Sequence, residues 1–144
     1  KSRMASVVLH TYRQVNETGQ MKLFRSHRDE YQDGHQTRDF VYVDDVCDVC
    51  MYMMHHRLTV KSGLYNLGSG KGRTFLDLVK ATFYAMGREP HIVFIDTPQD
   101  IRDTYQYFTE ADLSKLRETG YTSEFTKLED GIEDYVKNYL DKLK

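Results

Sequence analysis

The sequence contains no long apolar segment and no excess of charge of either sign, and these absences exclude several classes of protein. No apolar run approaches the roughly 20 residues of a membrane-spanning helix, and no signal-peptide pattern is present. The formal net charge of −2 gives no electrostatic reason to expect binding to nucleic acid or to an anionic membrane. With 40% hydrophobic and 29% charged residues, the composition is that of a soluble globular domain.

Cysteine is also scarce, with two among 144 residues. Two cysteines cannot form the framework of a disulfide-rich secreted protein, so we expect a cytoplasmic location. Cys47 and Cys50 form a C-x-x-C motif on a predicted helix. A zinc site would need two further converging ligands, whereas His55 and His56 lie further along the same helix. Because both cysteines fall on or beside the apolar face of this helix, we expect them to be buried and free rather than redox-active.

The sequence does not begin with methionine, and an apolar helix pattern starts within its first few residues. We therefore expect a segment from the middle of a longer protein, although 144 residues are enough for one ordinary domain.

The segment from Thr37 to Met54 combines a strand pattern with a helix pattern. Phe40–Val43 is β-branched or aromatic, which predicts a buried strand. Asp44 or Asp45 can then cap the first turn of a helix. The residues that repeat with helical spacing are Val46, Val49, Cys50, Met53 and Met54. This order is typical of an α/β protein.

Arg38 lies at the start of that predicted strand. An arginine in this position requires an anion, which is either a carboxylate of the protein or a phosphate of a ligand. The residues alone leave both possibilities open.

Further strands and helices alternate along the chain, which predicts an α/β fold. We expect a polar loop over His27–Gln36 and a buried strand over His91–Ile95. Thr74 and Asp77 have the spacing of a capping box, and Thr126 with Glu129 repeats it. The other predicted elements are a helix over 4–18 ended by Gly19, a strand over 21–24, a short strand after Gly63, a brief helix near 113–116 and a last helix over 128–143.

The glycines at 68, 70 and 72 invite a nucleotide-binding interpretation. The dinucleotide pattern requires a third glycine where Arg73 stands, and a phosphate-binding loop requires Ser or Thr where Gly72 stands. We therefore predict a flexible turn between a strand and a helix. A phosphate near the backbone N–H groups at the Thr74 helix start remains the alternative.

Four segments occur in a fixed order: KSRMASVVLH (1–10), TRDFVYVDDV (37–46), GLYNLGSG (63–70) and YQYFTEADLSKLRETGY (105–121). Together they resemble the C-terminal half of the ADP-L-glycero-D-manno-heptose 6-epimerases, which are extended short-chain dehydrogenases/reductases. The two central segments are similar to those of many nucleotide-sugar epimerases and dehydratases, whereas the first and last are more specific to the heptose enzymes.

The resemblance implies an activity and a cofactor. Enzymes of this family use NADP to oxidise C6″ of ADP-D-glycero-β-D-manno-heptose to a ketone, and return the hydride to the other face, for lipopolysaccharide core. One proton-transfer residue is the tyrosine of a Tyr-x-x-x-Lys pair, and the other is a lysine that corresponds to Lys1. The resemblance therefore implies that Lys1 is catalytic and lies at the NADP site. An amine can transfer protons near neutrality when burial or a neighbouring cation lowers its pKa.

The same resemblance implies a binding site for the ADP-sugar. Arg38 can pair with a pyrophosphate through two N–H groups. Phe24 and Tyr105 offer flat apolar surface and a hydroxyl. The residues carried over by motif are His10, Phe24, Arg25, Ser26, His27, Arg38 and Tyr105.

Two motifs of the family are missing from these 144 residues, namely Tyr-x-x-x-Lys and the glycine-rich dinucleotide fingerprint. We therefore interpret residues 1–144 as a single C-terminal substrate-binding region that lacks the N-terminal NADP-binding Rossmann domain. In the full-length protein, the strands of this region would complete the parallel sheet of that domain. We expect this chain alone to be inactive and the full-length enzyme to be a homo-oligomer. The alternatives are another nucleotide-sugar epimerase or dehydratase, or a stand-alone, non-catalytic module that binds a nucleotide sugar or a protein partner.

Overall fold

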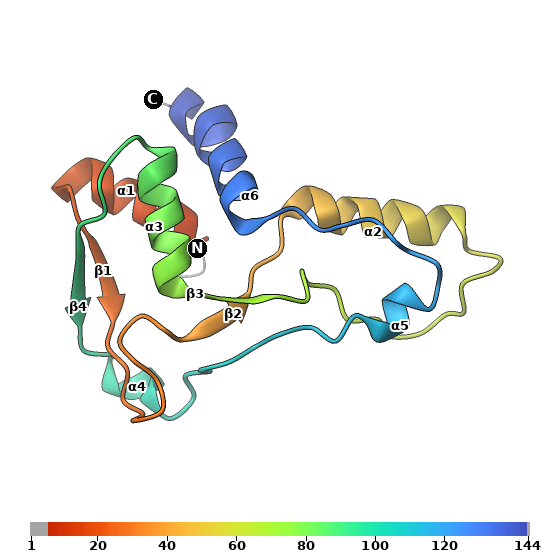
Figure 1. Cartoon of the computed structure of the whole chain (residues 1–144), viewed down its shortest axis with the longest axis horizontal. Coiled ribbons are helices and arrows are strands. Elements are labelled where there is room, and N and C mark those ends of the chain that lie inside the picture. Colours follow the sequence, from red (N-terminus) through yellow and green to blue (C-terminus); the bar gives the residue numbers. More distant parts are fainter. Residues whose placement is uncertain (1–5, 144) are drawn as a thin grey trace.

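The computed structural model describes residues 6–143 and shows an α/β fold (Figure 1). None of the helices in this range is long and apolar enough to cross a membrane. In chain order the elements are α1 (Val7–Thr18), β1 (Met21–Phe24), β2 (Thr37–Asp39), α2 (Val43–His55), β3 (Gly72–Thr74), α3 (Phe75–Ala85), β4 (Ile92–Ile95), α4 (Gln99–Arg102), α5 (Ser114–Arg117) and α6 (Leu128–Asp134), which continues as a π-helix over Tyr135–Leu140 and a 3₁₀ turn over Asp141–Leu143.

The strands form two separate pairs. β1 and β4 are parallel, with Met21 opposite Ile92, whereas β2 and β3 are antiparallel, with Arg38 opposite Arg73. The parallel pair confirms the predicted α/β class, because strands so far apart in sequence need helical connections between them. β4 is half-buried to exposed rather than buried on both faces as predicted, since β1 is its one partner in the sheet.

The larger part of the molecule, here called the body, consists of α1, β1, β4, α3 and α6. Helix α1 begins at Ser6, which accepts a hydrogen bond from the Val8 N–H, and ends at Gly19 in the left-handed conformation with φ of 75°. Helix α3 begins with the predicted capping box of Thr74 and Asp77. The core of the body comprises Val8, Tyr12, Val15, Met21, Leu23, Leu78, Val79, Ala81, Phe83, Ile132, Val136 and Leu140.

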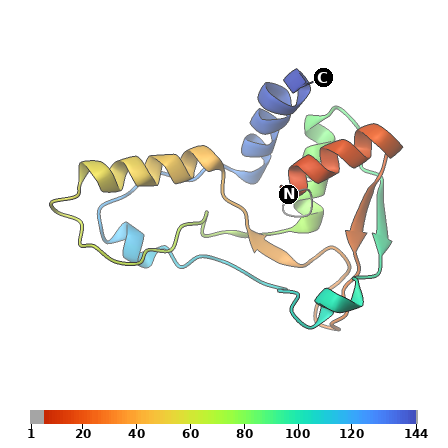
Figure 2. The same ribbon diagram turned by 180° about the vertical axis from the view of Figure 1, so that it is seen from behind.

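A thinner part, here called the arm, consists of α2, α5 and the connection over 58–67. It extends to one side of the body and is recognisable in both views (Figures 1 and 2). Its small core comprises Val49, Leu116 and Tyr121. In the connection, the side chains of Leu58 and Leu64 are 90% and 92% exposed.

The strand predicted over Phe40–Val43 is wrong. The strand lies three residues earlier, at Thr37–Asp39, where β3 provides its hydrogen-bonding partner. Helix α2 already begins at Val43, after Tyr42 in extended conformation. The Tyr42 hydroxyl donates a hydrogen bond to Asp134, and its ring packs so closely on Gly131 that a Cβ there would lie 3.0 Å from it. Residues 40–42 are thus an extended connection that packs against α6.

Helix α2 also departs from the expected pattern of caps and burial. Neither Asp44 nor Asp45 caps it, because the N-cap position is Tyr42 without a side-chain bond. Asp45 is instead buried and accepts hydrogen bonds from the N–H and hydroxyl of Thr126. Cys47 and Cys50 are free, as predicted, but both are exposed, because the packed face of the helix runs through Val49.

The capping box predicted at Thr126 and Glu129 is wrong, since Thr126 binds Asp45 and Glu129 binds Arg73. The predicted last helix over 128–143 is confirmed, with a π-helical and a 3₁₀ continuation. Its buried hydrophobic residues are Ile132, Val136 and Leu140, whereas Tyr139 and Leu143 are exposed. The wider turn of the π-helix keeps residues four apart on the same face. Residues 63–67, predicted to include a short strand, contain none.

Candidate functional site

Five residues from three distant segments meet where β1 ends, beside β2, four of them through their side chains and His27 through its backbone N–H. We call Phe24, His27, Arg38, Tyr105 and Tyr107 the aromatic cluster. The Phe24 and Tyr105 rings meet edge to face, with centroids 6.2 Å apart. The Tyr105 and Tyr107 rings do the same at 5.7 Å. The fold therefore brings together four of the residues that the resemblance implied, and adds Tyr107.

Arg38 lies between two rings of this region. Its guanidinium is 5.7 Å from the Tyr105 ring centroid and 5.5 Å from that of Phe75. It donates hydrogen bonds to the backbone carbonyls of Thr37 and Gln106. No carboxylate forms an ion pair with Arg38 in the part of the chain that the structure describes. Of the two anions considered from the sequence, the internal carboxylate is therefore not found, and the guanidinium charge lies half-buried without a counter-ion.

The electrostatic environment of Tyr105 reflects the same arrangement. Burial raises the pKa of the Tyr105 hydroxyl, and the neighbouring Tyr107 acts in the same direction, whereas the Arg38 charge opposes them. The net shift is upward, so the hydroxyl stays protonated at neutral pH. It can therefore donate a hydrogen bond to an anionic or carbonyl oxygen.

The loop after β1 is held by hydrogen bonds of its backbone and of the His27 side chain. The Arg25 N–H donates to the Ile95 carbonyl at 2.8 Å, and the Ser26 N–H to the Asp33 carboxylate at 2.8 Å. The His27 N–H donates to the Tyr107 hydroxyl at 2.9 Å, while its imidazole Nε2 accepts from the Thr97 N–H at 3.3 Å. Arg25 and His27 are exposed.

Two other predicted residues are not part of this cluster. The His10 side chain lies half-buried on α1 and shares no hydrogen bond or ring contact with the cluster within residues 6–143. Lys1, the expected catalytic and cofactor-site lysine, lies outside the described residues. The predictions for both remain untested.

Sequence reasoning missed Tyr107 and Gln36. Tyr107 is 6% exposed and Gln36 is 1% exposed. The Gln36 amide lies 3.5 and 3.4 Å from the carbonyls of Phe24 and Arg25, so it supports the loop from beneath. The alternation of Tyr105 and Tyr107 was the available signal for the first, but nothing in the sequence indicates a buried glutamine.

The glycine-rich turn is organised by Asp39. The Asp39 carboxylate accepts hydrogen bonds from the Ser69 N–H and hydroxyl, the Gly70 N–H and the Ala111 N–H, at 2.6 to 3.0 Å. A Cβ on Gly68 would lie only 2.4 Å from this carboxylate, so glycine is required there. The predicted flexible turn is therefore a turn that β2 fixes in place.

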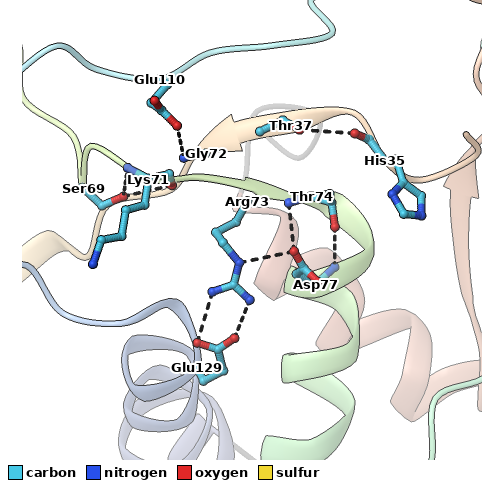
Figure 3. Close-up of polar contacts among 10 residues, drawn as sticks. All are labelled: His35, Thr37, Ser69, Lys71, Gly72, Arg73, Thr74, Asp77, Glu110 and Glu129. Carbon is cyan, nitrogen blue, oxygen red and sulfur yellow. Dashed lines mark hydrogen bonds and ion pairs between the residues drawn. The ribbon is translucent and has the colours of Figure 1, made fainter. Parts of the chain in front are cut away.

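The start of α3 already carries an internal anion (Figure 3). Asp77 accepts hydrogen bonds from the Thr74 N–H and from Arg73, and the Asp77 N–H donates to the Thr74 hydroxyl. Arg73 also forms a two-pronged ion pair with Glu129 of α6. A phosphate at this helix start, considered above, would have to displace the Asp77 carboxylate.

A groove among the described residues lies elsewhere. About 670 Å³ in volume, it lies between the start of α1, residues 39–43 and α6, and none of the cluster residues lines it. No group of three or more His, Cys, Asp or Glu side chains suited to a metal ion occurs over residues 6–143.

Comparison with known proteins relates this chain to sugar-nucleotide enzymes. Residues 1–68 match the model of the NAD dependent epimerase/dehydratase family. An ADP-L-glycero-D-manno-heptose-6-epimerase of Fusobacterium nucleatum is 49% identical over 148 residues, which cover 99% of this chain and 44% of the relative. The chain thus spans less than half the length of the curated relatives that it matches.

Solved structures agree with this relationship. The Helicobacter pylori ADP-L-glycero-D-manno-heptose-6-epimerase superimposes with a TM-score of 0.72 at 28% identity, over 94% of this chain and 38% of that one. A UDP-glucuronic acid 4-epimerase of Bacillus cereus, at 22% identity and a TM-score of 0.76 over 96% of this chain and 40% of that one, shares the fold. Over almost its whole length the chain is therefore similar to part of the ADP-L-glycero-D-manno-heptose-6-epimerases.

Proposed function

We propose that this chain is the nucleotide-sugar-binding region of an ADP-L-glycero-D-manno-heptose 6-epimerase. The aromatic cluster carries the proposal, because it places Arg38, which has no counter-ion within residues 6–143, beside the Tyr105 ring, and Tyr105 in turn meets the Phe24 ring. A nucleoside diphosphate has matching parts, since guanidinium groups bind phosphate oxygens in pairs and aromatic rings pack against flat apolar groups.

In this scheme Arg38 binds the pyrophosphate, and Phe24 and Tyr105 contact the remainder of the ADP-sugar. The loop residues Arg25, Ser26 and His27 and the α1 residue His10 complete the site. The support is the convergence of the end of β1, β2 and the segment at 105–107, which are far apart in sequence but close in the fold.

The chemistry would require parts of a longer protein. The reaction is an oxidation of C6″ to a ketone and a re-reduction on the opposite face. NADP, bound mainly by an N-terminal Rossmann domain, would supply and receive the hydride. Lys1 would transfer a proton at that carbon, and the strands of this chain would complete the parallel sheet of the Rossmann domain. The full-length enzyme would act in the cytoplasm as a homo-oligomer.

A calorimetric titration of this chain with ADP and with UDP tests the proposal. We expect ADP to bind more tightly than UDP, and Arg38→Ala to weaken ADP binding by about 1.5 to 3 kcal/mol, which is typical of hydrogen bonds to a charged group. Arg73→Ala is the matched control, because Arg73 lies opposite Arg38 on β3 but pairs with Asp77 and Glu129.

The outcomes separate the alternatives. Unchanged ADP affinity in the Arg38 variant would refute the pyrophosphate assignment. A preference for UDP would identify a different nucleotide-sugar epimerase or dehydratase, a reading that the fold shared with the Bacillus cereus enzyme makes worth testing. ADP binding without epimerisation of ADP-heptose on addition of NADP is expected of this chain, since it contains no Tyr-x-x-x-Lys sequence.

A further inference from the structure

Tyr107 is almost completely buried, yet it contacts each of the three segments that form the aromatic cluster. Its hydroxyl accepts a hydrogen bond from the His27 N–H at 2.9 Å, across 80 positions of sequence. Its backbone carbonyl accepts from the Thr37 N–H at 2.8 Å, directly before Arg38. Its ring meets that of Tyr105 at 5.7 Å. One residue thus joins the loop after β1, the strand β2 and the 105–107 segment.

The ring of Tyr107 also supports the far side of the loop. The Arg28 guanidinium lies 4.6 Å from the ring centroid, and the Tyr31 ring lies 5.0 Å away at 47°. The rings of Tyr105 and Tyr107 contact each other, and each also contacts an arginine: Arg38 lies over Tyr105 and Arg28 over Tyr107. Of these two tyrosines, Tyr107 is the one whose hydroxyl bonds to the loop backbone among the described residues.

A tyrosine buried only for packing would place its hydroxyl on any available acceptor. Here the partner is a backbone donor in the middle of the proposed substrate-contacting segment. If this bond is lost, the His27 N–H is left without its acceptor, and residues 25–28 gain freedom that a ligand must remove on binding.

We propose that Tyr107 is a positioning residue for the nucleotide-sugar site, which holds residues 25–28 in the conformation that receives the ligand. This inference rests on the proposed function and assigns to it a residue that the motif comparison does not include. Tyr107 acts through His27 and Arg28 rather than by touching the ligand.

The test is Tyr107→Phe in this chain, with ADP as the probe. We expect the dissociation constant for ADP to rise about three- to tenfold, as for the loss of one hydrogen bond, and the amide of His27 to exchange faster with solvent. Tyr52→Phe is the matched control, because the Tyr52 hydroxyl also bonds to the backbone, at the Thr119 carbonyl in the arm. It should leave ADP affinity unchanged, while both variants change the melting temperature by similar amounts.

The possible failures can be distinguished. If the unmodified chain does not bind ADP, the proposed function itself fails, and the positioning role with it. If the unmodified chain binds ADP and Tyr107→Phe binds it equally well, the function stands and the positioning role is overturned. Equal loss of affinity in the Tyr107 and Tyr52 variants would also overturn it, because the effect would then reflect general destabilisation.

Discussion

The body and the arm are stabilised in different ways. Twelve buried residues form the described core of the body, whereas three form that of the arm. Two aspartates lie where the arm meets the rest of the molecule: Asp39 of β2 binds the glycine-rich turn after the connection over 58–67, and Asp45 of α2 binds Thr126 before α6. The body is therefore held mainly by apolar packing, and the junction depends on carboxylates with saturated hydrogen bonds.

The largest expected effect separates the two cores. Phe83→Ala in the body should lower the free energy of unfolding by about 3 to 5 kcal/mol, because the completely buried ring leaves a cavity between helices. Leu116→Ala in the arm should cost about 2 kcal/mol, near the low end for such changes, because a thin structure can collapse into the space. Urea unfolding measures both values.

Hydrogen exchange adds the location of each effect. Leu116→Ala should accelerate exchange in α2 and α5 and leave α1 and α3 protected, whereas Phe83→Ala should affect all of them. If Leu116→Ala accelerated exchange equally in α1 and α3, the distinction between body and arm would be wrong.

A smaller effect is expected at the junction. Asp45→Ala removes the acceptor for the N–H and hydroxyl of Thr126 and should cost about 1.5 to 3 kcal/mol, since hydrogen bonds to a charged group are lost at a buried site. Urea unfolding gives the value, and exchange in the first turn of α2 shows whether the arm loosens. Asp44→Ala, one residue earlier and exposed, is the control. Equal stability of the two variants would show that Asp45 does not join the parts.

The smallest effect concerns the ion pair between Arg73 of β3 and Glu129 of α6. Glu129→Gln weakens the contact with Arg73 (Figure 3) and should cost about 0.5 kcal/mol at pH 7, because both side chains are partly exposed and screened by solvent. The hydrogen bond from Arg73 is the main reason that the pKa of Glu129 lies below its ordinary value of 4.5. A lowered pKa in the folded state means that the stabilisation is complete above that ordinary value, and is lost as pH falls through the folded value. The stability difference between the two proteins should therefore vanish at low pH, and a difference that persists at pH 2 would contradict the assignment.

Local signals in the sequence predicted the body well. The capping box of Thr74 and Asp77, the stop at Gly19 and the strand over 21–24 are all confirmed, because each depends on residues within a few positions of one another. Prediction failed where a distant partner decides the outcome. Phe40–Val43 has strand-forming residues, but β3 pairs with Thr37–Asp39 instead. Likewise, periodicity identified a face of α2 without showing which side would be covered, so Cys47 and Cys50 are exposed.

The site was predicted by motif rather than by physical reasoning. The residues alone left two possible anions for Arg38, a carboxylate of the protein or a phosphate of a ligand. In the described residues the Arg38 guanidinium contacts backbone carbonyls and aromatic rings and no carboxylate. The convergence of Phe24, Arg38 and Tyr105 could not be deduced from spacing, because it depends on the register of β1 against β4 and of β2 against β3. Tyr107 was missed for the same reason.

The bond between His27 and Tyr107 also has a consequence for how the protein is made. The two residues are 80 positions apart, and a ribosome adding about 5 to 20 residues per second needs roughly 4 to 16 seconds to synthesise the intervening chain. Until residues 92–95 have been made, β1 lacks its partner β4, so the strand edge is open to other nascent chains. The aromatic cluster cannot form before Tyr107 has been made, and slow elongation between residues 28 and 95 would lengthen the time in which β1 can associate wrongly.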